Sequence, residues 1–180
     1  MPILMHMVWC RRSKMSAEQY NRMAERMRQR PMALRMLLAC NQGMTWLVMI
    51  AYPLLLLYLL LLKRYEMLYH TVLIPGVAFV VVSVFRRIYN APRPYEKMDI
   101  TPLIAKDKQG QSFPSRHVFS AFMIGMCFLQ VSGILAGIIF AVGVFLSVVR
   151  VLGGVHYLQD VIAGAVLGVV IGIVGFYIIF

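Results

Sequence analysis

The chain has 180 residues, of which 61% are hydrophobic and 14% charged, and its 18 Lys and Arg outnumber seven Asp and Glu to give a net charge of +11. So apolar a chain excludes intrinsic disorder, and it argues against an ordinary soluble domain, where about 25% of residues are charged. The positive charge alone would suit nucleic acid, but the apolar content points to a bilayer. We therefore expect membrane lipids, and no nucleic acid, as partners.

Residues 1–36 form a basic N-terminal arm in this interpretation. Positions 11–35 hold eight of the 18 basic residues. Ser16 and Gln19 have the spacing of a capping box, and Pro31 predicts a break. The apolar residues between them recur at helical spacing and share one face: Tyr20, Met23, Ala24 and Met27. The alternatives are a helix lying on an anionic membrane surface and a solvated helix packed on the bundle, and we favour the first.

Residues 37–180 form the membrane domain, with five apolar segments at 44–62, 67–85, 118–131, 133–149 and 157–180. The first segment has an alternative start near Leu37. Each is expected to be helical, because lipid offers no partner to a bare backbone amide. The first would span roughly 28 Å, close to the hydrocarbon thickness, and Pro53 predicts a kink in it. The third is short but extendable upstream. The predicted fold is all-α: about five transmembrane helices in a bundle, plus an N-terminal amphipathic interfacial helix.

Cysteines and glycines are interpreted structurally. Three cysteines are far apart and lack metal-ligand spacing, so we expect reduced, apolar fillers: Cys10, Cys40 and Cys127. No cleavable signal peptide is expected, because the opening apolar stretch precedes its positive charges. Two helix faces carry small residues that we assign to packing within the chain rather than to a dimer: Gly133 with Gly137, and Gly164, Gly168 and Gly172. A homo-oligomer is compatible with the sequence but unsupported by it.

The second half of the chain concentrates its few charges at the ends of apolar segments. From position 116 onwards the charged residues and histidines are only Arg116, His117, Arg150, His156 and Asp160. Ionisable groups near a bilayer are costly and usually functional. Alternation of the segments across the membrane brings all five to one face, together with Arg86, Arg93 and the polar loop 88–113. Long ordered loops usually serve a site. His6 and His70 lack such company, and we expect them to be structural or interfacial.

These residue types together favour phosphate-ester hydrolysis. Arginine forks bind phosphate oxygens with paired hydrogen bonds, and a helix start such as that after Ser115 attracts anions. His156 and Asp160 are four residues apart, on one helical face, where the carboxylate is expected to fix the imidazole tautomer and to favour its charged form. His117 comes from another helix. One histidine can attack phosphorus while the other protonates the leaving oxygen, with no need for a metal.

At these residues the sequence resembles the type 2 phosphatidic acid phosphatase family. The first family motif, K-x6-R-P, matches Arg86 to Pro94 with Arg in place of Lys. The second, P-S-G-H, matches Pro114 to His117 with Arg in place of Gly. The third, S-R-x5-H-x3-D, matches Val149 to Asp160 with Val in place of Ser. The order and the spacing of all three motifs agree.

The resemblance implies a role for each matching residue. His156 is the expected nucleophile, which forms a phosphohistidine, Asp160 orients it, and His117 is the general acid. The implied phosphate ligands are Arg86, Arg93, Ser115, Arg116 and Arg150. No cofactor and no metal are implied. We expect Arg116 to narrow the substrate range or to favour a more anionic head group, such as a diphosphate.

The expected function is removal of the terminal phosphate from a lipid phosphate or diphosphate: phosphatidic acid, phosphatidylglycerol phosphate or a polyprenyl diphosphate. The alternatives are a catalytically silent binder of lipid phosphates and an anion transporter. The two histidines argue against the first, and charges at helix ends argue against the second. We expect an integral protein of a bacterial plasma membrane. The basic arm, opposed by Lys63 and Arg64, favours a site on the cytoplasmic face.

Overall fold

The computed structural model describes residues 16–105 and 109–179, so the expectations for His6, Cys10 and the N-terminal signal lie outside the described residues. The described residues contain helices and no strand. The helices are α2 (Ala17–Arg28), α3 (Pro31–Leu61), α4 (Tyr65–Tyr89), α5 (Pro94–Lys97), α6 (Arg116–Leu129), α7 (Gly133–Leu152), α8 (Leu158–Ile173) and the π-helical turn η1 (Val174–Ile179). The predicted all-α membrane bundle is confirmed.

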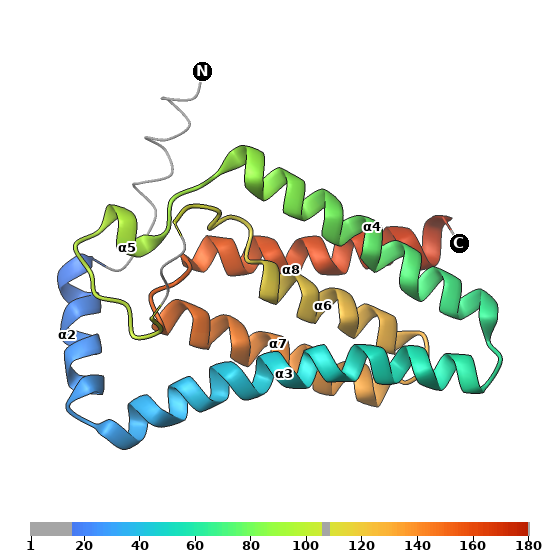
Figure 1. Cartoon of the computed structure of the whole chain (residues 1–180), viewed down its shortest axis with the longest axis horizontal. Coiled ribbons are helices and arrows are strands. Elements are labelled where there is room, and N and C mark those ends of the chain that lie inside the picture. The colour runs from blue at the N-terminus through green and yellow to red at the C-terminus, as the bar shows by residue number, and fades with distance from the viewer. Residues whose placement is uncertain (1–15, 106–108, 180) are drawn as a thin grey trace.

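Helix α6 is the centre of the bundle. It packs mainly against α7 and α8, while α3 and α4 form a long hairpin along the outside (Figure 1). Nine of its 14 residues are buried. Because neighbouring helices surround α6, its apolar surface contacts protein rather than lipid.

Four helices are long and apolar enough to cross a membrane: α3, α4 with the residues that follow it, α7, and α8 with η1. Helix α6 is a shorter apolar helix of 14 residues. At 1.5 Å per residue it spans roughly 21 Å, less than the hydrocarbon core of about 30 Å. The predicted third segment therefore exists but gains only two residues upstream, because Ser115 already has the extended backbone of an N-cap.

The break at Pro31 is confirmed, because this proline is the first residue of α3. The helix nevertheless starts well before the expected segment at 44–62, so residues 31–36 belong to the first bundle helix rather than to the arm. Proline at the first helical position lacks an N–H that would be unpaired there anyway. Pro53 lies inside α3, which continues as one helix to Leu61.

Helix α2 lies across the end of the bundle at which α6 and α8 begin (Figure 1). The predicted capping box is confirmed: the Gln19 N–H donates to Ser16 Oγ at 3.2 Å, and the Ser16 N–H donates to Gln19 Oε1 at 3.0 Å. The apolar face was expected to lie on lipid. Instead Tyr20 and Ala24 are buried against a cluster that includes Leu103, Ile104 and Val155, so the protein covers this face.

Two glycine series have different surroundings. A Cβ on Gly164 would lie 2.6 Å from the Ser115 carbonyl oxygen, and one on Gly168 would lie 2.9 Å from that of Phe119. With Gly172, which faces Met126, this series lets α8 approach α6 closely, as expected. The assignment is wrong for Gly133 and Gly137, where an added Cβ would meet nothing within 4 Å.

Candidate active site

Six of the predicted site residues are buried together at one end of the bundle. They come from the end of α4, the loop after it, the start of α6, the end of α7 and the start of α8. Each is at most 5% exposed: Arg86, Arg93, Ser115, Arg150, His156 and Asp160. Charged and polar groups this deeply buried need partners, and these residues find many of them in one another and in the loop backbone.

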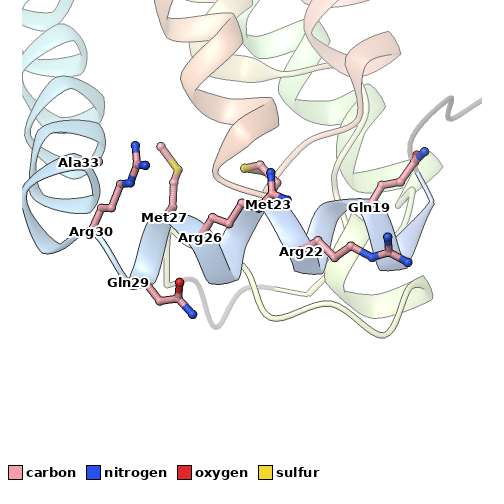
Figure 2. Close-up of a pocket in the computed structure, with 8 residues that line it drawn as sticks. All are labelled: Gln19, Arg22, Met23, Arg26, Met27, Gln29, Arg30 and Ala33. Carbon is pink, nitrogen blue, oxygen red and sulfur yellow. The ribbon is translucent and has the colours of Figure 1, made fainter.

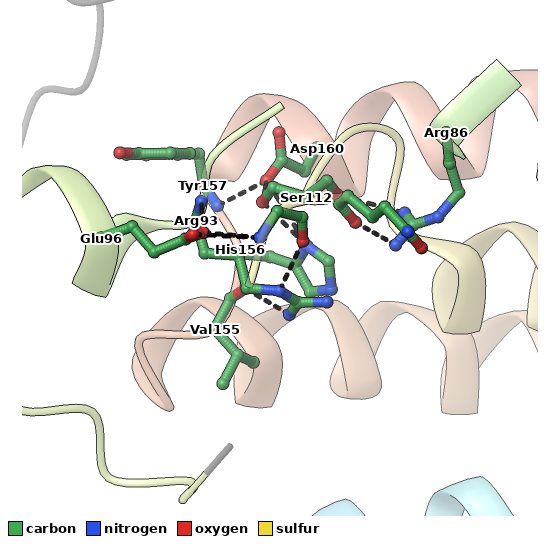
Figure 3. A network of polar contacts seen from close by, with 10 residues as sticks. Arg86, Arg93, Glu96, Ser112, Val155, His156, Tyr157 and Asp160 are labelled. Atoms are coloured by element: carbon green, nitrogen blue, oxygen red, sulfur yellow. Dashed lines mark hydrogen bonds and ion pairs between the residues drawn. The ribbon is translucent and has the colours of Figure 1, made fainter. Parts of the chain in front are cut away.

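The Asp160 carboxylate is the centre of this network (Figure 3). Its Oδ2 atom lies 3.4 Å from His156 Nδ1, accepts a hydrogen bond from Ser112 Oγ at 2.5 Å, and accepts another from the Tyr157 N–H at 3.0 Å. The Ser112 hydroxyl also lies 3.4 Å from His156 Nδ1. With Nδ1 facing the carboxylate, the imidazole keeps Nε2 for other contacts.

Burial lowers the pKa of His156 from its ordinary 6.5 to about 4. The Asp160 carboxylate opposes this effect by its hydrogen bond and its charge, whereas the positive charges of Arg93 and Arg150 add to it. The imidazole is therefore neutral at physiological pH. A neutral imidazole with Nδ1–H directed at a carboxylate presents a lone pair on Nε2, which is the form that a nucleophile requires.

Two arginines are held by backbone carbonyl groups of the loop after α4 and of the turn between α7 and α8. Arg93 donates from Nε to Gly110 O at 3.0 Å and from Nη1 to Val155 O at 3.2 Å. Arg86 donates from Nη1 to Ser112 O at 3.2 Å and from Nη2 to Gln111 O. Since a guanidinium has five N–H donors, these contacts fix each fork without using all of it. The same bonds hold the loop over the site.

Further contacts order the loop itself. Glu96 accepts from the Arg93 N–H at 2.6 Å and from the Gly110 N–H at 2.9 Å, so it joins the two ends of the loop. The Phe113 ring packs against Phe85 of α4, with 6.4 Å between ring centroids. These contacts place Ser112 beside the carboxylate of Asp160.

Three buried polar atoms of the predicted site residues have no hydrogen-bond partner among the described residues: Arg150 Nε, Ser115 Oγ and Asp160 Oδ1. Buried polar groups are almost always paired, so each such atom needs an explanation. Arg150 Nε and Ser115 Oγ are donors, and both would be satisfied by the oxygens of an anion bound in the site.

His117 and Arg116 lie in the first turn of α6 and are half-buried. The Ser115 N–H donates to the Asp160 carbonyl oxygen at 2.8 Å, which joins the start of α6 to the start of α8. The Arg116 guanidinium lies 5.5 Å from the centroid of the Phe79 ring. Arg116 is thus directed at a ring on α4, and the structure gives its fork a cation–π partner.

Sequence reasoning missed Ser112 and Glu96 as site residues. Neither residue was assigned to the site from the sequence. Both belong to the loop, where no periodic pattern indicates which side chains turn inward. The signal that could have found them is chemical: both are polar residues in the loop that also contains a predicted site arginine, Arg93. Among the described residues no group of three His, Cys, Asp or Glu could hold a metal ion.

Comparison with known proteins identifies the family of the chain. The family model of the PAP2 superfamily matches residues 65–180, which include every predicted site residue. The crystal structure of Aquifex aeolicus LpxE superposes with a TM-score of 0.63 at 26% identity, covering 76% of this chain and 82% of that one. A transmembrane PAP2-type phosphatidylglycerolphosphate phosphatase from Bacillus subtilis gives a TM-score of 0.47 at 19% identity, covering 87% and 90%.

No curated protein sequence matches the chain significantly. The family model nevertheless covers well over half of the 180 residues and ends on the last bundle helix. Its range begins at Tyr65, the first residue of α4, so α2 and α3 lie outside it. The chain is an integral-membrane protein and belongs to the PAP2 superfamily.

Proposed function

We propose that the protein is a lipid phosphatase that removes the terminal phosphate of a lipid phosphate or diphosphate through a phosphohistidine on His156. The observation that carries the proposal is the buried, neutral imidazole of His156 in a site where two buried donors, Arg150 Nε and Ser115 Oγ, have no partner among the described residues. A phosphoryl group is an anion that pairs with such donors and reacts with such an imidazole.

In the first step His156 Nε2 attacks phosphorus, and the bond from phosphorus to the ester or bridging oxygen breaks. His117 gives its proton to the departing oxygen. Asp160 holds Nδ1–H and stabilises the positive charge that develops on the ring. The guanidinium groups of Arg86, Arg93 and Arg150 stabilise the equatorial oxygens, which is the largest expected contribution to the rate.

In the second step water attacks the phosphohistidine. Neutral His117 takes a proton from the water, the bond from phosphorus to nitrogen breaks, and inorganic phosphate leaves with His156 neutral again. Both histidines thus return to their starting states, and no group other than water is consumed. Arg116, whose guanidinium lies over the Phe79 ring, adds a positive charge at the start of α6.

The substrate class follows from the location of the site. The buried arginines lie at the ends of membrane-spanning helices, so a head group is accessible there while its lipid tail stays in the bilayer. Phosphatidic acid, phosphatidylglycerol phosphate and a polyprenyl diphosphate all satisfy this condition. A catalytically silent lipid-phosphate binder is the alternative, and it would have no use for a neutral histidine held by a carboxylate.

The decisive experiment measures phosphate release by the purified full chain in detergent, with a chelator present, from each of these three lipids. We expect release from at least one of them. His156→Asn should lower kcat by about 10⁴-fold or more, the scale of losing a nucleophile. His70→Asn, on α4 but outside the site, is the matched control and should retain activity. An alkaline quench of the wild type should trap phosphate on histidine.

Three other results would each contradict a part of the proposal. Activity retained in His156→Asn would show that the nucleophile is misassigned. Loss of activity with chelator would contradict hydrolysis without a metal. Binding of all three lipids with no release would establish the silent binder.

A further inference from the structure

A groove lies away from the proposed catalytic residues, in the angle between α2 and the start of α3 (Figure 2). It is at the same end of the bundle as the site (Figure 1). Its volume is about 920 Å³, and it is lined by Gln19, Arg22, Met23, Arg26, Met27, Gln29, Arg30 and Ala33. None of these residues belongs to the proposed catalytic machinery, and all lie before the part of the chain that the family model matches.

The groove is strongly positive. Three of its eight lining residues are arginines and none is a carboxylate. Arg22 lies 3.7 Å from Glu18, with both side chains largely exposed. Arg26 and Arg30 make no ion pair or side-chain hydrogen bond with any residue that the structure describes. The N-terminus of α3 also opens here without a side-chain cap, so its partial positive charge adds to that of the arginines.

The floor of the same groove is apolar. Figure 2 shows Met23 and Met27 pointing from α2 towards the bundle, on the side on which Arg30 rises along α3. Both methionines pack at the edge of the buried cluster around Tyr20. Methionine side chains adapt to flexible hydrocarbon, while long arginine side chains extend along an apolar surface to reach a charged group. A ligand for this groove therefore has an anionic head and an apolar body.

We propose that this groove binds an anionic phospholipid of the surrounding bilayer. Its phosphodiester lies against Arg26 and Arg30, and its first methylene groups lie along Met23 and Met27. Charge complementarity selects this occupant over a zwitterionic lipid, since basic groups near a membrane surface attract anionic lipids. Helix α2 already buries its other apolar residues, Tyr20 and Ala24, against the protein. The lipid therefore binds in a site formed by α2 and α3, and α2 does not itself lie in the membrane interface.

The test uses the full chain in nanodiscs, with a fluorophore on Ala33→Cys at the wall of the groove. Cys10 and Cys40 are replaced by serine, and Cys127, which is buried, is left in place. Quenching is compared between brominated phosphatidylglycerol and brominated phosphatidylcholine in otherwise phosphatidylcholine discs. We expect phosphatidylglycerol to associate about tenfold more strongly, and this preference to decrease as salt screens the arginines.

Arg26→Gln/Arg30→Gln should abolish the preference, while the matched pair Lys63→Gln/Arg64→Gln, at the far end of α3, should keep it. Equal quenching by the two lipids, or a preference unchanged in Arg26→Gln/Arg30→Gln, would overturn the proposal. So would loss of the preference on adding inorganic phosphate at constant ionic strength, which would identify a site for free anions. Quenching that appears only after deletion of residues 1–15 would identify that segment as the occupant. None of these outcomes depends on phosphatase activity.

Discussion

Among single residues, Asp160 has the most demanding position. Its side chain is fully buried, and one of its oxygens serves the Ser112 hydroxyl, the Tyr157 amide and the imidazole of His156. Burying a carboxylate at the end of an apolar helix bundle costs free energy unless hydrogen-bond donors such as these surround it. Ser112 therefore has two roles: it satisfies the carboxylate, and it limits where the imidazole can turn.

Ser112→Ala should lower kcat by about tenfold to a hundredfold. A hydrogen bond to a charged group contributes about 1.5–3 kcal/mol, and its loss leaves the carboxylate oxygen with one donor fewer. Ser147→Ala is a suitable control, because the Ser147 hydroxyl donates to the Gly143 carbonyl oxygen within α7, away from the site. The check is kcat and KM for both variants on the preferred lipid. Equal activity in the two would remove Ser112 from the proposed site.

The low pKa of His156 gives a prediction for pH. Because burial and two arginines lower it to about 4, the ring should stay neutral as the pH falls from 8 to 5, whereas an ordinary histidine would gain a proton near 6.5. The measurement is a titration of ¹⁵N-histidine chemical shifts in the substrate-free protein, with the His156 signal assigned from His156→Asn. Between pH 6.5 and about 4, His156 binds a proton in the unfolded chain but not in the folded protein. The free energy of unfolding should therefore decrease as the pH falls below about 6.5. Protonation of His156 near 6.5 would contradict this prediction.

At the residue scale the sequence pointed to most of the residues that the structure buries together in the proposed site, because charge is scarce in an apolar chain. His156, Asp160 and the buried arginines stood out for that reason. Ser112 and Glu96 did not, because a hydroxyl or carboxylate in a polar loop is unremarkable until the backbone has turned it inward. The neutrality of His156 also needed coordinates, since burial sets it and no local pattern encodes depth.

Among the elements, α8 depends on its glycines. The site requires the start of α8 to approach the start of α6, where the Ser115 N–H donates to the Asp160 carbonyl oxygen at 2.8 Å. Gly164 is the residue whose missing side chain permits this approach, because its Cβ would meet the Ser115 carbonyl oxygen. Backbone atoms cannot move aside as a flexible side chain can.

Gly164→Ala should therefore destabilise the protein by about 1–3 kcal/mol, the usual cost of overpacking, and should also reduce activity. Gly137→Ala is the matched control: it lies on α7, faces open space, and should leave stability unchanged or slightly raised because alanine favours helix. Thermal unfolding in detergent measures both. Similar melting temperatures for the two variants would contradict the close contact between α6 and α8.

Element boundaries show where sequence patterns stop being informative. All five apolar helices were predicted in order, because their runs of apolar residues are long. The start of α3 was placed too late, since residues 31–43 mix polar and apolar side chains that only helix continuity joins. The prediction that the apolar face of α2 lies on lipid was wrong. Amphipathicity indicates that a helix face is covered, but it does not distinguish cover by protein from cover by membrane.

For the whole molecule, alternation of the five helices puts the N-terminal helix α2 and the helix ends that carry the proposed site at one end, with the turn between α3 and α4 at the other (Figure 1). The sequence predicted this arrangement from segment count alone. The basic arm then favours the cytoplasmic side for the site, since Lys and Arg accumulate in cytoplasmic loops. The anionic-lipid groove belongs to this same end.

Orientation is testable with two single cysteines in a background without native ones. Asp99→Cys reports the site end, and Arg64→Cys reports the turn between α3 and α4; both positions are exposed. In intact cells a membrane-impermeant maleimide should label Arg64→Cys and leave Asp99→Cys unlabelled until the membrane is opened. The reverse pattern would place the site on the outer face and the arm with it.

The burial of α6 by its neighbours also bears on how the protein meets membranes of different thickness. Acyl chains that are longer or shorter than the span of a helix are accommodated by tilting those helices that touch them. Here these are the outer helices, while nine of the 14 residues of α6 are shielded. Helix α6 carries Ser115, Arg116 and His117 at its start, so mismatch reaches the catalytic groups only through the surrounding helices. We therefore expect the position of these groups to depend little on the length of the surrounding acyl chains.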